Sequence, residues 1–300
     1  MREPVTSLSQ RRVLFALGLT LLFAAAAAAQ QAPATTPMQQ AVVFGQKIMY
    51  VDTGGHADSP VVVLLHGLGG NSTNWAFNTP ALGGKFRVIV PDQIGFGQSD
   101  KPLVNYRVGT YVDFLDKLLE QLKVGRATLV GNSMGGWVAA AYALKYPAKV
   151  ERLVLVDAAG FAPPKEFDLS TLSGLNPSTR DEMKRLAGMV FYNPLFKSDA
   201  VIDTLLAQRM SAGDGYTIQR LVESIYRGED MLDGKLSAIK QPVLLVWGRE
   251  DGLTPLAREG ERFKRELPSA QLIVFDQCGH VPQVEKAAEF NAAVLKFLSQ

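Results

Sequence analysis

The sequence predicts an α/β fold that consists of an open sheet and an all-helical insertion. Short apolar segments rich in β-branched residues, such as residues 60–65 and 242–247, alternate with segments of helical periodicity. Between residues 161 and 238 this alternation stops, and three helical patterns follow one another. Open α/β sheets with an inserted subdomain often reach the length of this chain, 300 residues. We therefore expect an α/β core, residues 42–160 and 239–300, with a helical cap, residues 161–238.

Residues 1–29 have the pattern of an export signal. Arg11 and Arg12 precede an uncharged stretch, residues 13–29, that ends in alanines. A basic region, an apolar region and small residues at a cleavage site follow this order in signal peptides, and the arginine pair also fits a twin-arginine signal. As a helix with a rise of about 1.5 Å per residue, the stretch spans roughly 25 Å, which is short of the ~30 Å hydrocarbon core of a membrane. We therefore expect a cleaved signal peptide rather than an anchor, and an exported protein, periplasmic or secreted, without a membrane span after cleavage.

The charges of the chain balance once this segment is removed. The whole chain has 31 Lys and Arg and 29 Asp and Glu, and residues 1–29 carry three arginines and one glutamate, which leaves 28 of each sign. A neutral chain without a basic run argues against a nucleic-acid partner. The single cysteine, Cys278, excludes an intrachain disulfide and a cysteine-based metal cluster, and we expect it to be a small buried hydrophobe.

The first strands of the core follow a polar segment. Residues 30–41 are interrupted by prolines and predict a flexible tether. Residues 42–44 and 47–52 predict two strands joined at Gly45. The fully apolar run 60–65 predicts a central strand.

The central strand ends in a glycine loop, His66-Gly67-Leu68-Gly69-Gly70. Glycines let a backbone approach a ligand closely, so that an N–H group can point at a reacting oxygen. We expect the backbone N–H groups of Leu68 and Met134 to form an oxyanion hole. An ordinary glycine turn would explain the loop if no nucleophile followed it in the chain.

Residues 86–90 predict the next strand. The loop after it, residues 91–100, falls at the carboxyl end of that strand, where open α/β sheets bind their ligands. Asp92 lies in this loop, and its early position in the chain favours a structural role. Residues 110–122 then predict an amphipathic helix.

A serine between a strand and a helix is the strongest functional signal. The run 127–130 precedes Gly131-Asn132-Ser133-Met134-Gly135-Gly136, and a helical segment, residues 137–146, follows it. G-x-S-x-G in this context is a nucleophile elbow. The turn is so tight that the positions two before and two after the serine must be small, and both are glycine. We expect Ser133 in a strained backbone conformation that exposes its hydroxyl to a base, at a helix N-terminus that favours negative charge.

The helical cap contains three apolar stripes with helical spacing. The first stripe includes Met183 and Leu186, and Ser178 or Thr179 can cap its helix. Many aromatic and methionine side chains in the cap predict an apolar binding surface, although about half of them must pack the cap's own core. The residues expected to line the substrate pocket are Gly67, Trp137, Phe191, Tyr192 and Val281.

A serine hydroxyl needs a base within hydrogen-bond reach, and the chain has three histidines. His56 lies in a polar stretch. His66 precedes the serine, which is the wrong order for this arrangement, and we expect it to brace the glycine loop. His280 follows the last predicted strand, residues 271–275, in the place that a Ser…Asp…His order requires. His280 is therefore the predicted base.

The third group of the site is an acid that orients the imidazole. Asp251 follows the strand predicted at 242–247, and we expect it to fix the tautomer of His280 and to stabilise the imidazolium. Asp157, which closes the strand predicted at 150–156, is the alternative acid. A final amphipathic helix is predicted over residues 286–298.

The order of five motifs resembles the α/β-hydrolase fold superfamily from residue 42 to the C-terminus. These motifs are HGLGG, PDQIGFGQSDKP, GNSMGG, WGREDGLTP and CGHVPQVE. The resemblance implies an eight-stranded, mostly parallel sheet with helices on both faces, and Ser133, Asp251 and His280 as the catalytic triad. The superfamily's epoxide hydrolases and haloalkane dehalogenases use an aspartate nucleophile, which the serine at this position excludes.

Two groups within the superfamily are similar to this chain. The segment LNPSTRDEMKRLAGMVFYNPLF is similar to the cap of monoacylglycerol-lipase-like members, which hydrolyse short and medium lipid esters. GNSMGG also resembles the C–C bond hydrolases of aromatic-ring degradation. Those commonly have a tryptophan directly after the histidine, where this chain has Val281.

The leading prediction is a serine hydrolase that cleaves carboxylic esters of small or medium apolar acyl groups through an acyl-enzyme intermediate. One alternative is C–C bond hydrolysis of a ring-cleavage vinylogous 1,5-diketone by the same triad. Another is a non-catalytic ligand receptor on the same fold, which the complete triad disfavours because a receptor gains nothing from an activated serine. Three scattered histidines and no HExxH motif imply no metal or organic cofactor, and the expected partner is a small-molecule ester.

Overall fold

The computed structural model describes residues 36–55, 59–163 and 169–300, which belong to one structural unit. The segment with the predicted export signal, residues 1–29, lies outside the described residues, and so does His56.

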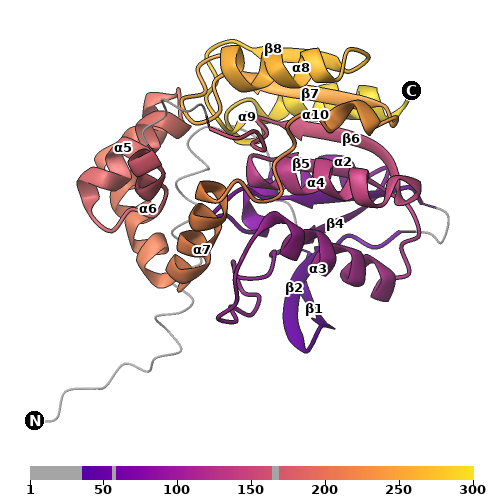
Figure 1. The fold of residues 1–300 in the computed structure, drawn as a ribbon, viewed down its shortest axis with the longest axis horizontal. Helices are drawn as coiled ribbons and strands as arrows, with labels where there is room; N and C mark the ends of the chain where they lie inside the picture. Colours follow the sequence, from indigo (N-terminus) through magenta and orange to yellow (C-terminus); the bar gives the residue numbers. More distant parts are fainter. Residues whose placement is uncertain (1–35, 56–58, 164–168) are drawn as a thin grey trace, which may run out of the picture. The chain divides into compact units, whose positions relative to one another are not determined.

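An eight-stranded sheet forms the centre of this unit (Figure 1). The strands are β1 (Met38–Val43), β2 (Gln46–Asp52), β3 (Val61–Leu65), β4 (Arg87–Pro91), β5 (Ala127–Asn132), β6 (Val150–Val156), β7 (Val243–Gly248) and β8 (Gln271–Phe275). Their order in the sheet is β1-β2-β4-β3-β5-β6-β7-β8. The β1–β2 and β2–β4 pairs are antiparallel, and the pairs from β4 to β8 are parallel. The eight-stranded, mostly parallel sheet is therefore confirmed.

Helices cover both faces of the sheet. The α-helices are α2 (Thr79–Gly83), α3 (Val108–Gln121), α4 (Met134–Lys145), α5 (Arg180–Val190), α6 (Asp199–Ser211), α7 (Gly215–Tyr226), α8 (Glu261–Glu266), α9 (Pro282–Glu285) and α10 (Ala287–Leu298). The 3-10 helices are η1 (Ser72–Trp75), η2 (Pro147–Lys149), η3 (Leu169–Leu175), η4 (Pro194–Lys197) and η5 (Leu236–Ala238), and η6 (Leu256–Gly260) is a π-helical turn.

The alternation of side chains along the strands creates two apolar cores. Val63 and Leu65 of β3 belong to one core, which packs against α3, α4 and α8. Val62 and Leu64 belong to the other, which packs against α2 and α10. Cys278 is also fully buried, as expected for a small apolar residue, and burial raises the pKa of its thiol.

The flexible tether predicted for residues 30–41 is wrong at its C-terminal end. Met38 pairs with Val51 and Ala41 pairs with Ile48 in the antiparallel β1–β2 ladder. Because β1 lies at the edge of the sheet and exposes much of its surface, polar glutamines occupy it where a central strand has apolar residues. The core therefore begins at Met38. Backbone hydrogen bonds to β2 hold this strand in the sheet, and its polar side chains give no sign of them.

Within the described residues, every regular element between β6 and β7 is helical. Figure 1 shows α5, α6 and α7 together at one end of the sheet, which confirms the three predicted helices. Thr179 caps α5: its side chain accepts a hydrogen bond from the Glu182 N–H, and the Glu182 carboxylate accepts one from the Thr179 N–H. We call residues 161–238 the helical insertion below.

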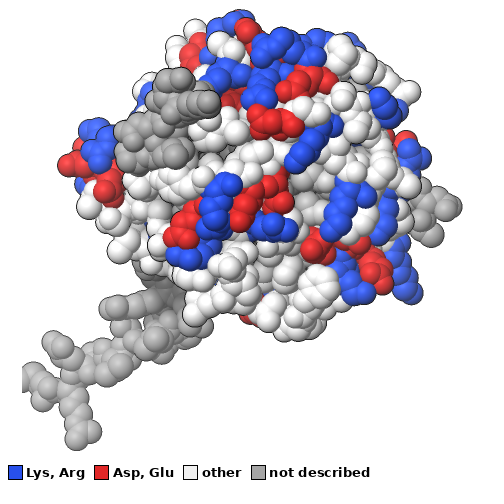
Figure 2. Space-filling view, in the orientation of Figure 1, with Lys and Arg blue, Asp and Glu red and all other residues white. Residues whose placement is uncertain are grey.

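The surface carries charges of both signs. On the face in Figure 2, Lys and Arg are interspersed with Asp and Glu. Surface ion pairs such as Lys117–Glu120 and Arg126–Glu151, each with an N–O distance of 2.9 Å, follow from this mixing. Among the described helices, none combines the length and apolar character that a membrane crossing requires.

Candidate active site

Ser133 occupies the sharp turn between β5 and α4 and is partly exposed. Its backbone angles are φ 56° and ψ −120°, a strained conformation for a residue with a side chain. A Cβ added at Gly131 would lie closer than 3.0 Å to the carbonyl of Gly135, and a Cβ added at Gly135 would lie as close to the carbonyl of Leu65. The prediction that both flanking positions must be small is therefore confirmed.

The glycine loop after β3 borders Ser133. A Cβ added at Gly67 would lie 3.1 Å from the Cβ of Ser133. The Gly70 N–H donates to the Gly67 carbonyl over 3.1 Å and closes a turn around Leu68. Met134 is the first residue of α4, where backbone N–H groups have no intrahelical acceptor. Both predicted oxyanion donors therefore come from segments that adjoin the serine.

His66 braces this loop, as the sequence predicts. Its Nδ1–H donates to the Gly67 carbonyl over 2.8 Å, and its Nε2 accepts the Gln93 N–H over 3.0 Å. Burial lowers the pKa of His66, so the imidazole stays neutral and keeps this tautomer. Asp92 has the predicted structural role, since its carboxylate accepts the backbone N–H groups of Gln98 in its own loop and of Ser72 in η1.

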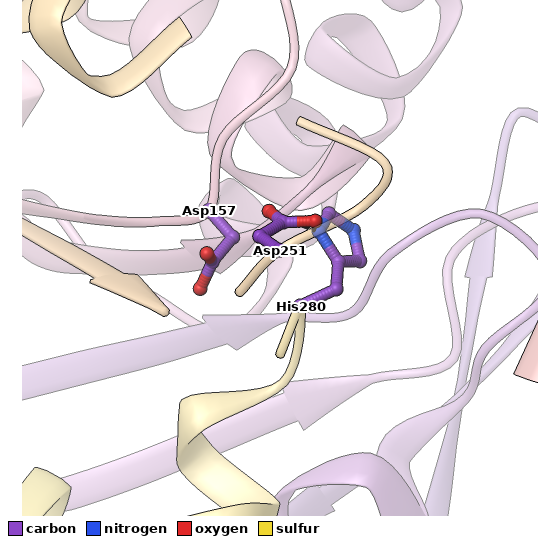
Figure 3. Close-up of side chains that lie close together, drawn as sticks. All are labelled: Asp157, Asp251 and His280. Atoms are coloured by element: carbon purple, nitrogen blue, oxygen red, sulfur yellow. Dashed lines mark hydrogen bonds and ion pairs between the residues drawn. The ribbon is translucent and has the colours of Figure 1, made fainter. Parts of the chain in front are cut away.

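Asp251 and His280 form a buried acid–base pair. The His280 Nδ1–H donates to Asp251 Oδ2 over 2.8 Å, and Figure 3 shows the carboxylate directed at the imidazole. Asp251 Oδ1 accepts the N–H groups of Leu253 and Thr254, and the Thr254 hydroxyl lies 2.6 Å from Oδ2. Burial alone would raise the pKa of Asp251, but the charge and hydrogen bond of His280, with the hydrogen bond from Thr254, lower it to about 2. The acid is therefore ionised and fixes one tautomer of His280.

The loops that carry the serine and the histidine are joined through Asn132. Its Nδ2 donates to the carbonyl of His280 over 3.0 Å and to that of Val156 over 3.2 Å. Within the described part of the chain, no hydrogen bond links the Ser133 hydroxyl to the His280 ring. Such bonds are often long in an enzyme without substrate and tighten when the substrate binds.

Asp157, the alternative acid, lies beside this pair rather than on the imidazole. Its Oδ1 accepts the Gly248 N–H over 2.9 Å. One carboxyl oxygen each of Asp157 and Asp251 and one ring nitrogen of His280 lie within 4.8 Å of one another, a spacing that could hold a metal ion. Asp251 and His280 are already joined by the Nδ1–Oδ2 hydrogen bond, so the cluster fits an acid–base pair better than a metal site.

The predicted pocket residues have different surroundings. Trp137 is buried in the larger core, and its indole N–H donates over 2.9 Å to a backbone carbonyl that follows α7. Phe191 stacks on Phe196 with a centroid distance of 5.1 Å, while Tyr192 is 40% exposed. Val281 directly follows His280 and is partly buried. Their contact with a substrate stays a prediction.

A buried cation in α6 has no counterpart among the residues predicted from the sequence. Arg209 of α6 reaches the glycine loop, because a Cβ added at Gly69 would lie 2.8 Å from its Nη1. Its other terminal nitrogen, Nη2, forms an ion pair with Asp214, and the two side chains are only 10% and 1% exposed. Burial lowers the pKa of Arg209, yet the guanidinium remains charged at neutral pH. An arginine on a helix is usually solvent-exposed, so the local sequence gives no indication that Arg209 is buried.

A second missed residue is Glu285 at the end of α9. Its carboxylate accepts the N–H groups of Gly279, Tyr192 and Asn193 over 2.8, 3.0 and 2.8 Å. Burial raises its pKa. The loop before His280 is thereby tied to the segment that follows α5 in the helical insertion.

The chain is similar in sequence and in structure to known hydrolases. Residues 60–287 match the alpha/beta hydrolase fold family. The chain is 34% identical over 267 residues to a 2-hydroxy-6-oxononadienedioate/2-hydroxy-6-oxononatrienedioate hydrolase of Burkholderia vietnamiensis, with 84% of this chain and 91% of the relative covered. A meta-cleavage product hydrolase of Pseudomonas fluorescens superposes with a TM-score of 0.75 at 29% identity, over 87% of this chain and 97% of the other. A thermophilic esterase of Thermogutta terrifontis superposes with a TM-score of 0.74 at 25% identity, over 88% and 98%.

Proposed function

This chain is a hydrolase that belongs to the α/β-hydrolase fold family, and we propose that it hydrolyses a C–C bond in substrates of the 2-hydroxy-6-oxo-dienoate class. The leading prediction from sequence was an ester hydrolase that resembles monoacylglycerol-lipase-like proteins. The relatives named above support the alternative better, since a 34% identical protein and a superposable structure both carry names of C–C bond hydrolases. This similarity over nearly the whole length of the relative is the observation on which the proposal depends.

Arg209 supplies a structural reason for the same substrate class. A dienoate carries a carboxylate that must leave water when it enters a buried site, and an unpaired buried charge is costly. Nη1 of Arg209 faces the glycine loop that borders Ser133, while Nη2 is engaged with Asp214. A guanidinium is well suited to a carboxylate because its geometry allows bidentate hydrogen bonds. A neutral ester of an apolar acid has no group that needs such a partner.

The chemistry proceeds at the ketone carbon of the substrate. Ser133 attacks this carbon while His280 takes the hydroxyl proton, and the N–H groups of Leu68 and Met134 stabilise the oxyanion. For the leaving group to be an enolate, the substrate must react as its 2,6-diketo tautomer, in which the proton of the 2-hydroxyl group has moved to C5. The C5–C6 bond then breaks, and the extended enolate takes the proton of the His280 imidazolium on its 2-oxygen and departs as a 2-hydroxydienoate. Water, deprotonated by His280, hydrolyses the acyl-enzyme to a carboxylic acid. Asp251 holds the imidazole in the tautomer that both steps need.

Ester hydrolysis is the second candidate. Val281 follows His280 where the C–C bond hydrolases commonly have tryptophan, and a structural neighbour at 25% identity is an esterase. The same triad can perform both reactions, because each passes through an oxyanion and an acyl-enzyme.

Parallel assays of the purified protein separate the candidates. We expect kcat/KM for a 2-hydroxy-6-oxo-dienoate to exceed that for p-nitrophenyl butyrate by at least about a hundredfold. The reverse ratio would instead support an ester hydrolase. Ser133→Ala should abolish both reactions, and a fluorophosphonate should label Ser133 stoichiometrically. Absence of labelling in a folded protein would favour a non-catalytic receptor.

A further inference from the structure

We propose that Asp157 is a positioning residue that remains uncharged and donates a hydrogen bond from its carboxyl group to the carboxylate of Asp251. The proposal rests on the triad described above and adds a fourth member to it. It also replaces the role of alternative acid that the sequence suggests for Asp157, since an uncharged group cannot stabilise an imidazolium by its charge.

The distribution of hydrogen-bond donors indicates which of the two carboxyl groups carries the proton. Asp251 accepts hydrogen bonds from two backbone N–H groups, the Thr254 hydroxyl and the His280 ring. Asp157 accepts only the Gly248 N–H, through Oδ1. Its Oδ2 is buried and accepts no hydrogen bond in the described structure. A buried carboxylate oxygen without a donor is unfavourable, whereas a protonated Oδ2 becomes a donor itself.

Asp157 is held rigidly beside its acceptor. Its side chain is fully buried, and one of its carboxyl oxygens lies within 4.8 Å of an oxygen of Asp251 and a ring nitrogen of His280 (Figure 3). Its N–H donates to the Val246 carbonyl over 2.9 Å, and its own carbonyl lies 3.0 Å from the Thr254 hydroxyl. Its φ of 42° places it in the left-handed region, which aspartate tolerates better than most residues. Neighbouring strands and loops thus determine the position of the carboxyl group.

The electrostatic surroundings agree with this geometry. Burial is the largest cause that raises the pKa of Asp157 well above its ordinary value, and the charge and hydrogen bond of Asp251 raise it further. Two carboxyl groups at this distance do not both ionise readily. The titratable groups that face Asp157 are Asp251 from the loop after β7, Cys278 and His280 from the loop after β8, and Glu285 from α9. Within this set, His280 is the only group that can carry a positive charge.

A neutral donor at this place affects His280 through Asp251. The hydrogen bond from Asp157 withdraws negative charge from the Asp251 carboxylate, which weakens its preference for the imidazolium form. Loss of the donor should therefore move the acidic limb of the pH–rate profile to higher pH. If Asp157 were ionised instead, its replacement by an uncharged residue would remove a negative charge and move that limb to lower pH. The direction of the shift thus reports the charge of Asp157.

Two substitutions of similar size test the proposal. Asp157→Asn keeps the shape, since its carbonyl can accept the Gly248 N–H and its amide can donate to Asp251. Asp157→Leu removes the donor. The readout is the rate of Ser133 labelling by a fluorophosphonate as a function of pH, which needs no knowledge of the substrate. We expect Asp157→Leu to slow labelling about tenfold or more, the effect of one hydrogen bond to a charged group, and to shift the acidic limb upward.

Asp157→Asn should restore most of this rate and leave the acidic limb near its wild-type position. A downward shift of the limb in Asp157→Asn, or a loss as large as that in Asp157→Leu, would overturn the proposal. If Asp157→Leu does not fold, the position of the acidic limb in Asp157→Asn is sufficient to test the proposal. If the wild-type protein is not labelled, the proposed nucleophile is wrong, and infrared difference spectroscopy still tests Asp157. A protonated carboxylic acid band at pH 7 that vanishes in Asp157→Asn supports the proposal, and an unchanged spectrum refutes it.

Discussion

Replacement of Arg209 by methionine tests the proposed substrate class most directly. Methionine preserves much of the apolar stem of arginine but removes the guanidinium that pairs with Asp214 and faces Gly69. The variant loses one charge-assisted interaction with the substrate carboxylate, for which about 1.5–3 kcal/mol is typical. This corresponds to roughly a 10- to 150-fold decrease in kcat/KM for a dienoate. A neutral ester such as p-nitrophenyl butyrate should change much less, so the ratio of the two activities is the decisive measurement.

Stability must be separated from recognition in this experiment. Asp214 is 1% exposed, and without Arg209 it would be a buried charge without its partner, which costs about 3–5 kcal/mol. The matched control is therefore the double variant Arg209→Met/Asp214→Asn, in which both charges are absent. We expect its unfolding free energy to recover toward the wild-type value while dienoate cleavage remains impaired. Dienoate cleavage at the wild-type rate by a stable double variant would refute a role for Arg209 in carboxylate binding.

Three further predictions follow from the geometry of the site. Asp251→Asn should lower kcat by roughly 10⁴-fold with little loss of stability, because an amide leaves His280 in the wrong tautomer; a decrease below tenfold in steady-state assays would contradict its role as the acid. Gly135→Ala should destabilise the protein severely, since its Cβ would overlap the Leu65 carbonyl, and a melting temperature equal to that of wild type would show that the elbow can relax. Asp157 has a raised pKa, so the folded protein retains a proton that the unfolded chain releases above about pH 4, and stability falls as pH rises through this window. Asp157→Asn removes this contribution. The unfolding free energy of the variant, measured in urea, should therefore increase relative to that of wild type from pH 4.5 to pH 7.

Local signals were sufficient for much of the fold and for the sharp turn that holds Ser133. The strands at 150–156 and 271–275 were predicted with the observed bounds, because each contains an apolar run with β-branched residues, 153–156 and 272–275. The elbow at Ser133 was equally clear, since its steric requirements are met by glycines within a few residues. The edge strand β1 was missed because its stability comes from backbone pairing with β2 rather than from buried side chains.

The choice between two acids required coordinates. Asp157 and Asp251 each follow a buried strand, and β6 and β7 are neighbours in the sheet, so sequence places both carboxyl groups near the same point. Only the loop geometry shows that Asp251 reaches the imidazole, while Asp157 turns toward Gly248. Arg209 and Glu285 were missed for a related reason, because their partners lie in other elements that sequence spacing does not bring together.

The helical insertion contacts both the glycine loop and the loops of the acid–base pair, and this constrains how its sequence can vary. Its α6 carries the guanidinium that faces the glycine loop, whereas the end of α5 contacts both loops of the acid–base pair. The Gly252 N–H donates to the Met189 carbonyl over 3.0 Å, and the His280 N–H donates to the Val190 carbonyl over 2.7 Å. Both contacts use backbone atoms, so they tolerate side-chain substitution but not a change in the length or direction of α5. Side chains on α6 and α7 can therefore vary more freely than the length of α5, whose end must keep its position against the loop of His280.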